Sequence, residues 1–310
     1  MARHGTARPG APLGRPALPL VKILLIGKTA GYETARLSDA AAGRGHALTA
    51  LSWSDIRLRS GIDAMIDIGG RCVADFDLLY VRRFWPHVSE VLILARAFAA
   101  AGTPVVDAAL LTEPFVMSKM GDLQTLAAAG IPVPRTVQCF SHADAEAALQ
   151  AFRFPVVVKG VYGRAGTRVF LAEDAARVSH VLRSAPHAGF FSLQEYLPTD
   201  HDLRVITIGH RALGAMRRTI PHGDFRANLA VGGIADAVAL PDDLARLAEQ
   251  ASRALGREFA GVDILVSDGK PYVLEVNRAP GFKGFESATG IDVAEAFLTH
   301  CERRLAEAAD

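Results

Sequence analysis

Cysteine and long apolar runs are both scarce in this sequence. The three cysteines lie far apart and form no CxxC pair, which excludes a disulfide framework and the usual zinc-binding motifs. The most apolar stretch, residues 88–102, is interrupted by Glu90 and Arg96, and it is shorter than the roughly 18 apolar residues that a membrane-spanning helix needs. We therefore expect a cytoplasmic protein with no structural metal site and no membrane partner.

An excess of charge is also missing. Lysine and arginine together number 34 and aspartate and glutamate 33, so the formal net charge is +1. Such a balance gives no strong field to attract a polyanion, and we expect no nucleic acid partner. Residues 1–20 hold four prolines and three arginines but no apolar core of a secretion signal, which indicates a disordered leader.

Apolar residues, in contrast, are numerous enough for two or three lobes. Half of the 310 residues are hydrophobic, so each lobe can bury a core of its own. Residues 21–112 predict a small α/β lobe, because short apolar runs alternate with helical patterns. The first strand lacks the GxGxxG pattern, so a dinucleotide-binding fold is not supported. The elements expected here are strands at 21–27, 77–81 and 104–107 and helices at 32–45 and 89–102.

Two further lobes follow. A helix at 117–130 ends before the segment 131–134, whose two prolines cannot continue it. We assign residues 113–190 to a central lobe, where two antiparallel strands around a glycine loop indicate a flap, and residues 191–310 to a C-terminal lobe. The expected elements are strands at 154–159, 168–172, 202–208, 211–219, 262–266 and 272–277, with helices from 174 and at 242–256.

The last predicted hairpin carries three oxygen-bearing side chains among apolar neighbours. Glu275 and Asn277 are two residues apart, so they point to the same face of their strand. A strictly two-residue loop at 268–269 would place Asp263 opposite Leu274, whereas an odd loop or a bulge would place it opposite Glu275. If the three side chains bind a metal, we therefore predict the odd register, and oxygen ligands select magnesium or manganese over zinc. The alternative is a surface hairpin with solvated acids.

Several lysine and arginine side chains could bind phosphates next to such a metal ion. Lys159 ends an apolar strand just before a loop that contains Gly163 and Gly166, and glycines let a backbone close over a phosphate. Lys119 lies on an earlier predicted helix. Guanidinium groups suit phosphate and carboxylate alike, and four of them lie within 23 positions, at Arg204, Arg217, Arg218 and Arg226. The alternative for the glycine loop is an ordinary hairpin turn, and the alternative for Lys119 is a solvated helix lysine. The four arginines could instead belong to a salt-bridged surface.

Several segments occur in the order found in one enzyme superfamily. They are VVVKG, QEYL, DLR, GDFRANLAVGG, GVDIL and LEVNRAPGFKGFE. On these segments, the sequence from Val21 to about Arg304 resembles the ATP-grasp carboxylate-amine ligases, and more narrowly the RimK-like α-L-glutamate ligases. The resemblance implies the ATP-grasp fold, of class α/β (α+β), with an N-terminal Rossmann-like pre-ATP-grasp lobe, a central flap lobe and a C-terminal antiparallel-sheet lobe.

The resemblance also implies roles for individual residues. Lys119 and Lys159 would hold the α- and β-phosphates of ATP, and Asp202 would contact the nucleotide. Arg204 and Arg218 would be the catalytic residues, which bind the transferred phosphate or the carboxylate that is activated. The remaining nucleotide contacts would be Gln194, Glu195, Tyr196, Arg226, Ala227 and Asn228. The cofactors would be ATP and two Mg²⁺ or Mn²⁺ ions, with the metal ligands Asp263, Glu275 and Asn277.

The implied reaction joins a carboxylate to an amine. The carboxylate would attack the γ-phosphate of ATP to form an acyl phosphate, and the amine would then displace phosphate to give an amide, ADP and Pi. The partners would be an amino acid, with glutamate the first candidate, and a carboxylate acceptor that is a small molecule, a peptide or a protein. RimK-like relatives self-associate, so a homo-oligomer is also implied. The alternatives are phosphoryl transfer to a hydroxyl group and a non-catalytic nucleotide-binding scaffold.

Overall fold

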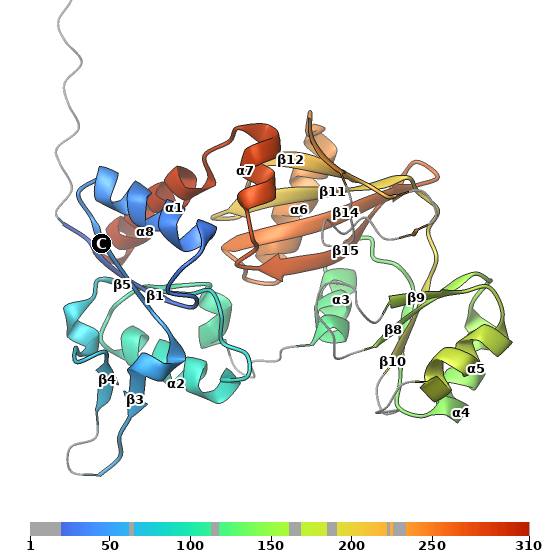
Figure 1. Ribbon diagram of the computed structural model, residues 1–310, viewed down its shortest axis with the longest axis horizontal. Coiled ribbons are helices and arrows are strands. Elements are labelled where there is room, and N and C mark those ends of the chain that lie inside the picture. Colours follow the sequence, from blue (N-terminus) through green and yellow to red (C-terminus); the bar gives the residue numbers. More distant parts are fainter. Residues whose placement is uncertain are drawn as a thin grey trace, which may run out of the picture.

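The computed structural model describes residues 20–61, 65–112, 118–160, 169–184, 191–221, 224–225 and 234–309. The expected leader lies almost wholly outside these ranges, and so does the glycine loop around Gly163 and Gly166. Three sheets of four or five strands organise the described residues (Figure 1), one parallel and two antiparallel. This architecture confirms the predicted α/β (α+β) class. No helix in these ranges has both the length and the apolar character needed to cross a membrane.

The first sheet is parallel, with the strand order β2-β1-β5-β6. The elements of this part of the chain are β1 (Lys22–Ile26), α1 (Tyr32–Gly43), β2 (Ala47–Leu51), β3 (Ile56–Leu58), β4 (Ile66–Ile68), β5 (Leu78–Val81), α2 (Val88–Ala100) and β6 (Val105–Val106). Residues 23–26 of β1 form a continuous apolar run, because helices cover both faces of the sheet. Ile23 and Leu25 enter a core shared with α1, whereas Leu24 and Ile26 enter a core shared with α2.

Helix α8 (Val293–Ala309) also belongs to the first lobe, although it follows all the other elements in the sequence. It lies beside α1 (Figure 1), and its Phe297 and Leu298 are fully buried in the core that contains Leu25 and Leu37. The sequence patterns did not predict this helix. It closes the face of the first sheet that α1 alone leaves partly open.

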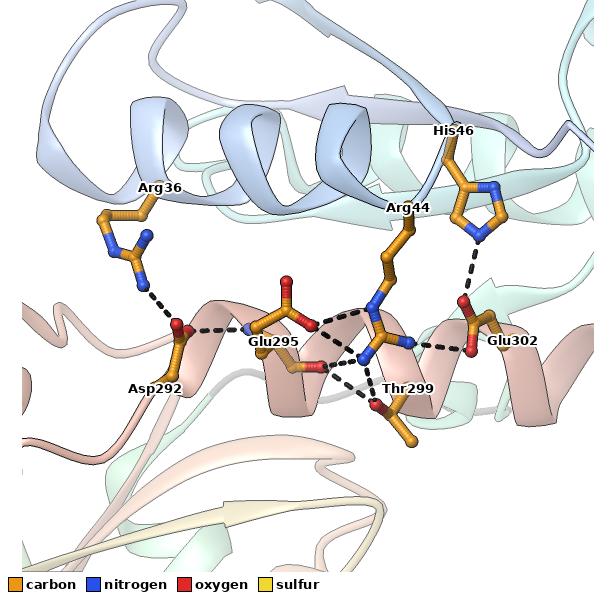
Figure 2. Close-up of polar contacts among 7 residues, drawn as sticks. All are labelled: Arg36, Arg44, His46, Asp292, Glu295, Thr299 and Glu302. Atoms are coloured by element: carbon orange, nitrogen blue, oxygen red, sulfur yellow. Dashed lines mark hydrogen bonds and ion pairs between the residues drawn. The ribbon is translucent and has the colours of Figure 1, made fainter. Parts of the chain in front are cut away.

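A group of polar side chains lines the contact between α1 and α8, and Figure 2 shows how they face one another. We call this group the α1–α8 seam; its members are Arg36, Arg44, His46, Asp292, Glu295, Thr299 and Glu302. Arg44 lies at its centre and makes contacts of 2.8 Å with the side chains of Glu295, Thr299 and Glu302. Because the charged side chains of these Arg44 pairs are 20 to 43% exposed, the ion pairs remain in contact with solvent.

The second sheet is antiparallel, with the strand order β7-β10-β8-β9. Its elements are β7 (Thr136–Cys139), α4 (His142–Ala148), β8 (Val156–Gly160), β9 (Val169–Ala172), α5 (Ala175–Ser184) and β10 (Phe191–Glu195). The antiparallel pairing of β8 with β9 confirms the two strands predicted for the flap. Strand β10, which lies just after the predicted boundary at residue 190, pairs with β7 and β8 and so adds to this sheet.

The third sheet is antiparallel, with the strand order β13-β12-β11-β14-β15. The elements around it are α3 (Lys119–Ala128), β11 (His201–Ile208), β12 (Arg211–Thr219), β13 (Ile234–Val238), α6 (Asp242–Ala254), β14 (Phe259–Ser267), β15 (Lys270–Arg278) and α7 (Lys283–Thr289). Helix α6 covers one face, where Ala248 shares a core with Val262. The other face of this sheet has two parts. Ile206, Met216 and Phe259 join the core of the first lobe, and the opposite end of the same face is polar.

The hairpin of β14 and β15 has the register that brings its oxygen-bearing side chains together. Its turn has two residues, 268–269, both with positive φ (49° and 73°), as a type I′ turn requires. The register then shifts between Asp263 and Ile264, so that Asp263 pairs with Glu275 and Leu274 is the extra residue of a bulge. The predicted odd register is therefore confirmed, and a bulge produces it.

Candidate functional site

One end of the third sheet carries polar side chains in a row on a single face. Arg218 of β12 lies opposite Asp202 of β11, and Arg204 of β11 lies opposite Asp263 of β14. Asp263 in turn lies opposite Glu275 of β15. Opposite residues and residues two apart share a face, so the strands bring six predicted site residues together. We call them the polar row; they are Asp202, Arg204, Arg218, Asp263, Glu275 and Asn277.

Two arginines hold the carboxylates at the centre of the polar row. Arg218 Nε and Nη2 donate to the two oxygens of Asp202, each at 2.7 Å, and Nη2 also lies 3.1 Å from Asp263 Oδ2. Arg204 Nε donates to Asp263 Oδ1, and its Nη2 donates to Asp263 Oδ2 at 2.7 Å. Such two-pronged pairs fix the orientation of both partners. Asp263 therefore accepts hydrogen bonds from both arginines at once.

Burial and the arginines act in opposite directions on these carboxyl groups. Burial favours the neutral form of Asp263, but the charges of Arg204 and Arg218 outweigh it and hold the pKa of this carboxyl below its usual value. At Asp202, burial outweighs the contact with Arg218, and the pKa is raised. Asp263 is thus the carboxylate of this pair that the protein holds more firmly in its charged form.

The three predicted metal ligands offer oxygen atoms, which Mg²⁺ prefers. Asn277 Nδ2 donates toward Asp263 Oδ2 at 3.4 Å, and Glu275, with 37% of its side chain exposed, lies at the open end of the row. Within the described ranges, no group of three or more His, Cys, Asp or Glu side chains is placed to hold a metal ion. An ion held by only the two carboxylates and the amide oxygen of the row would need further oxygens from phosphate and water, as Mg²⁺ takes.

A pocket of about 150 Å³ lies between the second and third sheets. Val157 and Val169 of the second sheet and Leu265 and Leu274 of the third make its walls largely apolar, as suits the flat ring of a nucleotide base. Five predicted nucleotide contacts also line it, namely Lys159, Gln194, Glu195, Tyr196 and Asp202. Since Asp202 belongs to both the pocket and the polar row, the two form one continuous site.

Lys159 lies on the wall of this pocket with a neutral partner. Its Nζ donates to Gln194 Oε1 at 2.6 Å, and Gln194 Nε2 donates to Thr136 Oγ1 at 2.8 Å. Loss of water contact lowers the pKa of Lys159 to about 8, although the nearby charge of Glu275 opposes this change. The lysine is therefore mostly charged at neutral pH, and its charge is available to a phosphate.

Glu195 and Lys119 are turned toward other groups of the protein. Glu195 Oε1 accepts a hydrogen bond of 2.7 Å from the backbone N–H of Arg135, and the Glu195 N–H donates to the Arg135 carbonyl at 3.0 Å. These bonds fix the end of β10 at the pocket. Lys119 Nζ lies 3.3 Å from Glu275 Oε1, so its charge meets the open end of the polar row.

Three predicted nucleotide contacts lie outside the described residues, namely Arg226, Ala227 and Asn228. The structure adds residues that sequence reasoning missed. Leu265 lies two residues from Asp263 on β14, so strand alternation could have indicated that it faces the site. Leu274 reaches the pocket as the bulge residue, and Thr136 meets Gln194 only through the pairing of β7 with β10. No local pattern in the sequence marks either position.

Sequence comparison finds relatives along most of the chain. A model of the RimK-like ATP-grasp domain matches residues 117–301. A protein of Xanthomonas oryzae pv. oryzae, named probable alpha-L-glutamate ligase, is 34% identical over 291 residues, which cover 90% of this chain and 96% of that protein.

Solved structures share the fold. A RimK domain protein ATP-grasp from Sphaerobacter thermophilus superposes with a TM-score of 0.67 at 24% identity, covering 90% of this chain and 98% of that chain. The ATP-grasp ligase PsnB, complexed with a minimal precursor, Mg and ADP, gives a TM-score of 0.66 at 22% identity, covering 92% and 97%. At these identities the likeness concerns the fold, and it confirms the predicted ATP-grasp arrangement.

Proposed function

The chain belongs to the RimK-like ATP-grasp family and is an ATP-dependent ligase, and we propose that it joins a carboxylate to an amine through an acyl phosphate. Glutamate is the amine proposed first, because relatives such as the Xanthomonas protein are named probable alpha-L-glutamate ligase. The acceptor is a carboxylate of a small molecule, a peptide or a protein.

The observation that carries this proposal is the continuity of the pocket with the polar row at Asp202. A ligase of this kind needs a base-binding pocket next to charges of both signs, because it must hold a polyanionic nucleotide and a carboxylate that repel each other. The pocket offers apolar walls and Lys159, and the row offers Arg204 and Arg218 beside carboxylates. A non-catalytic nucleotide-binding scaffold would have no need for buried carboxylates at this position.

In the proposed mechanism, cations of the protein neutralise the nucleotide phosphates. Lys159 and Lys119 both lie near Glu275, and both would bind phosphate oxygens. A divalent cation at Asp263, Glu275 and Asn277 would supply further neutralisation of the phosphoryl oxygens. Arg226, Ala227 and Asn228 complete the proposed set of nucleotide contacts.

Arg204 and Arg218 are the proposed catalytic residues. Their guanidinium groups would orient the acceptor carboxylate, one oxygen of which attacks the γ-phosphorus as the bond to ADP breaks. The amine then attacks the carbonyl carbon of the acyl phosphate, phosphate leaves, and the amine loses its proton. Strands β8 and β9 would support a flap that keeps water from this intermediate.

We propose that the enzyme works in the cytoplasm and as a homo-oligomer. Its three cysteines, Cys72, Cys139 and Cys301, are free thiols, which suits a reducing compartment.

The test is a screen for ADP release that pairs each amino acid with candidate carboxylates in the presence of Mg²⁺ and then measures the product mass. A product heavier by one amino acid minus water, together with a hydroxamate when hydroxylamine is added, is expected of a ligase that forms an acyl phosphate. A phosphorylated alcohol without hydroxamate would point instead to phosphoryl transfer. Nucleotide binding with no ADP release from any pair would point to a scaffold.

A further inference from the structure

Arg82, at the carboxyl end of β5 in the first lobe, reaches the loop that follows β15. Its Nη2 donates to the Pro280 carbonyl at 2.9 Å and approaches the Ala279 carbonyl at 3.4 Å. These two residues come directly after Asn277 and Arg278 in the sequence. A side chain of the first lobe therefore holds the backbone next to the proposed metal ligands of the third sheet.

The surroundings of Arg82 restrict its movement. The guanidinium carbon lies 6.0 Å from the ring centres of Tyr80 and Phe259 and 5.6 Å from that of Phe282, and its Nη1 lies 3.4 Å from the Tyr80 hydroxyl. Ring faces attract a cation that has lost part of its hydration. Because the guanidinium is planar and rigid, the rings that fix its plane also fix the two carbonyls that it binds.

The loop held by Arg82 and the stem of Arg204 both lie close to Gly261. At this glycine, an added Cβ would lie 3.0 Å from Arg204 Cδ and 3.0 Å from Pro280 Cβ. Pro280 and the proposed catalytic arginine thus share the small space above this glycine. A shift of the loop would change the space available to Arg204.

The first lobe also contacts the segment 278–280 at a second point. Asp107, just after β6, accepts a hydrogen bond from Arg278 Nη1 through Oδ2 and from the backbone N–H of Glu258 at 2.6 Å through Oδ1. Strands β5 and β6 are neighbours in the first sheet. Their carboxyl ends therefore hold Arg278 and the two residues after it, next to Asn277.

We propose that Arg82 is a positioning residue of the ligase reaction: by fixing the carbonyls of Ala279 and Pro280 it keeps Arg204 and Asn277 in their places relative to the first lobe. This inference rests on the proposed function. Arg82 acts through the loop and does not itself contact the reacting atoms.

The test compares Arg82→Ala and Arg82→Lys with the matched variant Arg83→Ala. Arg83 carries the same charge one residue further on and is exposed, and its described contacts are made by its backbone, with Trp53 and Ile26. Four quantities are measured for each variant: kcat and the KM for ATP in the ADP-release assay, hydrogen exchange of peptides covering the first lobe and residues 270–290, and the midpoint of thermal unfolding.

We expect Arg82→Ala to lower kcat by about 100-fold, the scale expected for a small misplacement of catalytic groups, with little change in the KM for ATP. Exchange should become faster in residues 279–290, and Arg82→Lys, which retains the positive charge and one donor nitrogen, should restore part of both properties. Arg83→Ala should behave as the unmodified enzyme. Equal kcat in Arg82→Ala and Arg83→Ala, or faster exchange spread evenly over the first lobe, would overturn the proposal.

Hydrogen exchange separates this inference from the proposed function. If the unmodified protein releases no ADP with any acceptor, the proposed function fails, and the exchange of residues 279–290 still decides whether Arg82 holds the loop. If the unmodified protein is active and Arg82→Ala leaves kcat unchanged, the positioning role fails and the ligase function stands.

Discussion

The polar row and the α1–α8 seam both set arginines against carboxylates, but they differ in burial. In the row, the side chains of Arg218 and Asp263 are 8% and 9% exposed. In the seam, those of Arg44 and Glu295 are 26% and 43% exposed. Water weakens the attraction between charges in the seam, whereas a charge in the row that loses its partner has little water to replace it. Removing one partner of an arginine–carboxylate pair should therefore have a small effect on stability in the seam and a large effect in the polar row.

The largest effect should follow Asp263→Ala, which breaks the row at its centre. Arg204 would lose its carboxylate partner and Arg218 one of two. Breaking a buried ion pair by removing one partner costs about 3 to 5 kcal/mol, and the free energy of unfolding measured in urea should fall by that amount, with loss of ADP release.

Glu275→Gln is the matched variant for this experiment, because Glu275 lies at the exposed end of the same row. It should also abolish ADP release, but it should change the free energy of unfolding by less than about 1 kcal/mol. If both variants were destabilised equally, burial would not be the property that distinguishes the parts of the row.

A middle-sized effect should appear in the pH dependence of ATP use. The pKa of Lys159 is lowered to about 8. The value of kcat/KM for ATP should therefore fall as pH rises through 8, by up to about tenfold per pH unit. Lys159→Arg should remove this decline even if its activity is lower, and a flat profile in the unmodified enzyme would contradict the assignment.

Unfolding does not explain the expected decline. The folded-state pKa of Lys159 lies below the unfolded value of 10.5, so burial of the charged lysine disfavours the folded state below pH 8. The contribution of this lysine to stability therefore improves as pH rises from about 8 toward 10.5. A parallel measurement of the thermal midpoint over the same pH range should show no loss that Lys159 could cause.

The smallest effect should follow Arg44→Ala in the seam. Partly exposed ion pairs contribute about 0.2 to 1 kcal/mol each, and the loss should shrink further in high salt. Leu37→Ala, on the buried side of α1, should in contrast cost about 2 to 5 kcal/mol. If Arg44→Ala destabilised the protein as much as Leu37→Ala, the seam rather than the apolar core would hold α8 in place.

The sequence predicted elements best where one local pattern determines burial. Strands β1, β5 and β6 of the first sheet are buried on both faces, so their apolar runs are unbroken, and the apolar residues of helices α2 and α6 recur at helical spacing. Strands β2 and β13 have no such run and were not predicted. Helix α8 was missed as well, and its place beside α1 depends on contacts between residues more than two hundred positions apart, which no local pattern contains.

The site was predictable to a similar extent. The register of Asp263 could be predicted because a strand has only two faces, and requiring Asp263 and Glu275 to share one left a single choice. The double contact of Arg218 with Asp202 and Asp263 could not be predicted, because it joins three strands and the sequence does not show their order in the sheet. The orientation of Glu195 toward Arg135 likewise depends on the pairing of β10 within its sheet.

The position of α8 has a consequence for the order in which the protein is made. The core of the first lobe joins Leu25 and Leu37 with Phe297 and Leu298, yet residues 293–309 leave the ribosome after the residues of all three sheets. Lobes made early usually fold early. Here the lobe that is begun first can close its core only after α8 emerges, so the second and third sheets can form before it does.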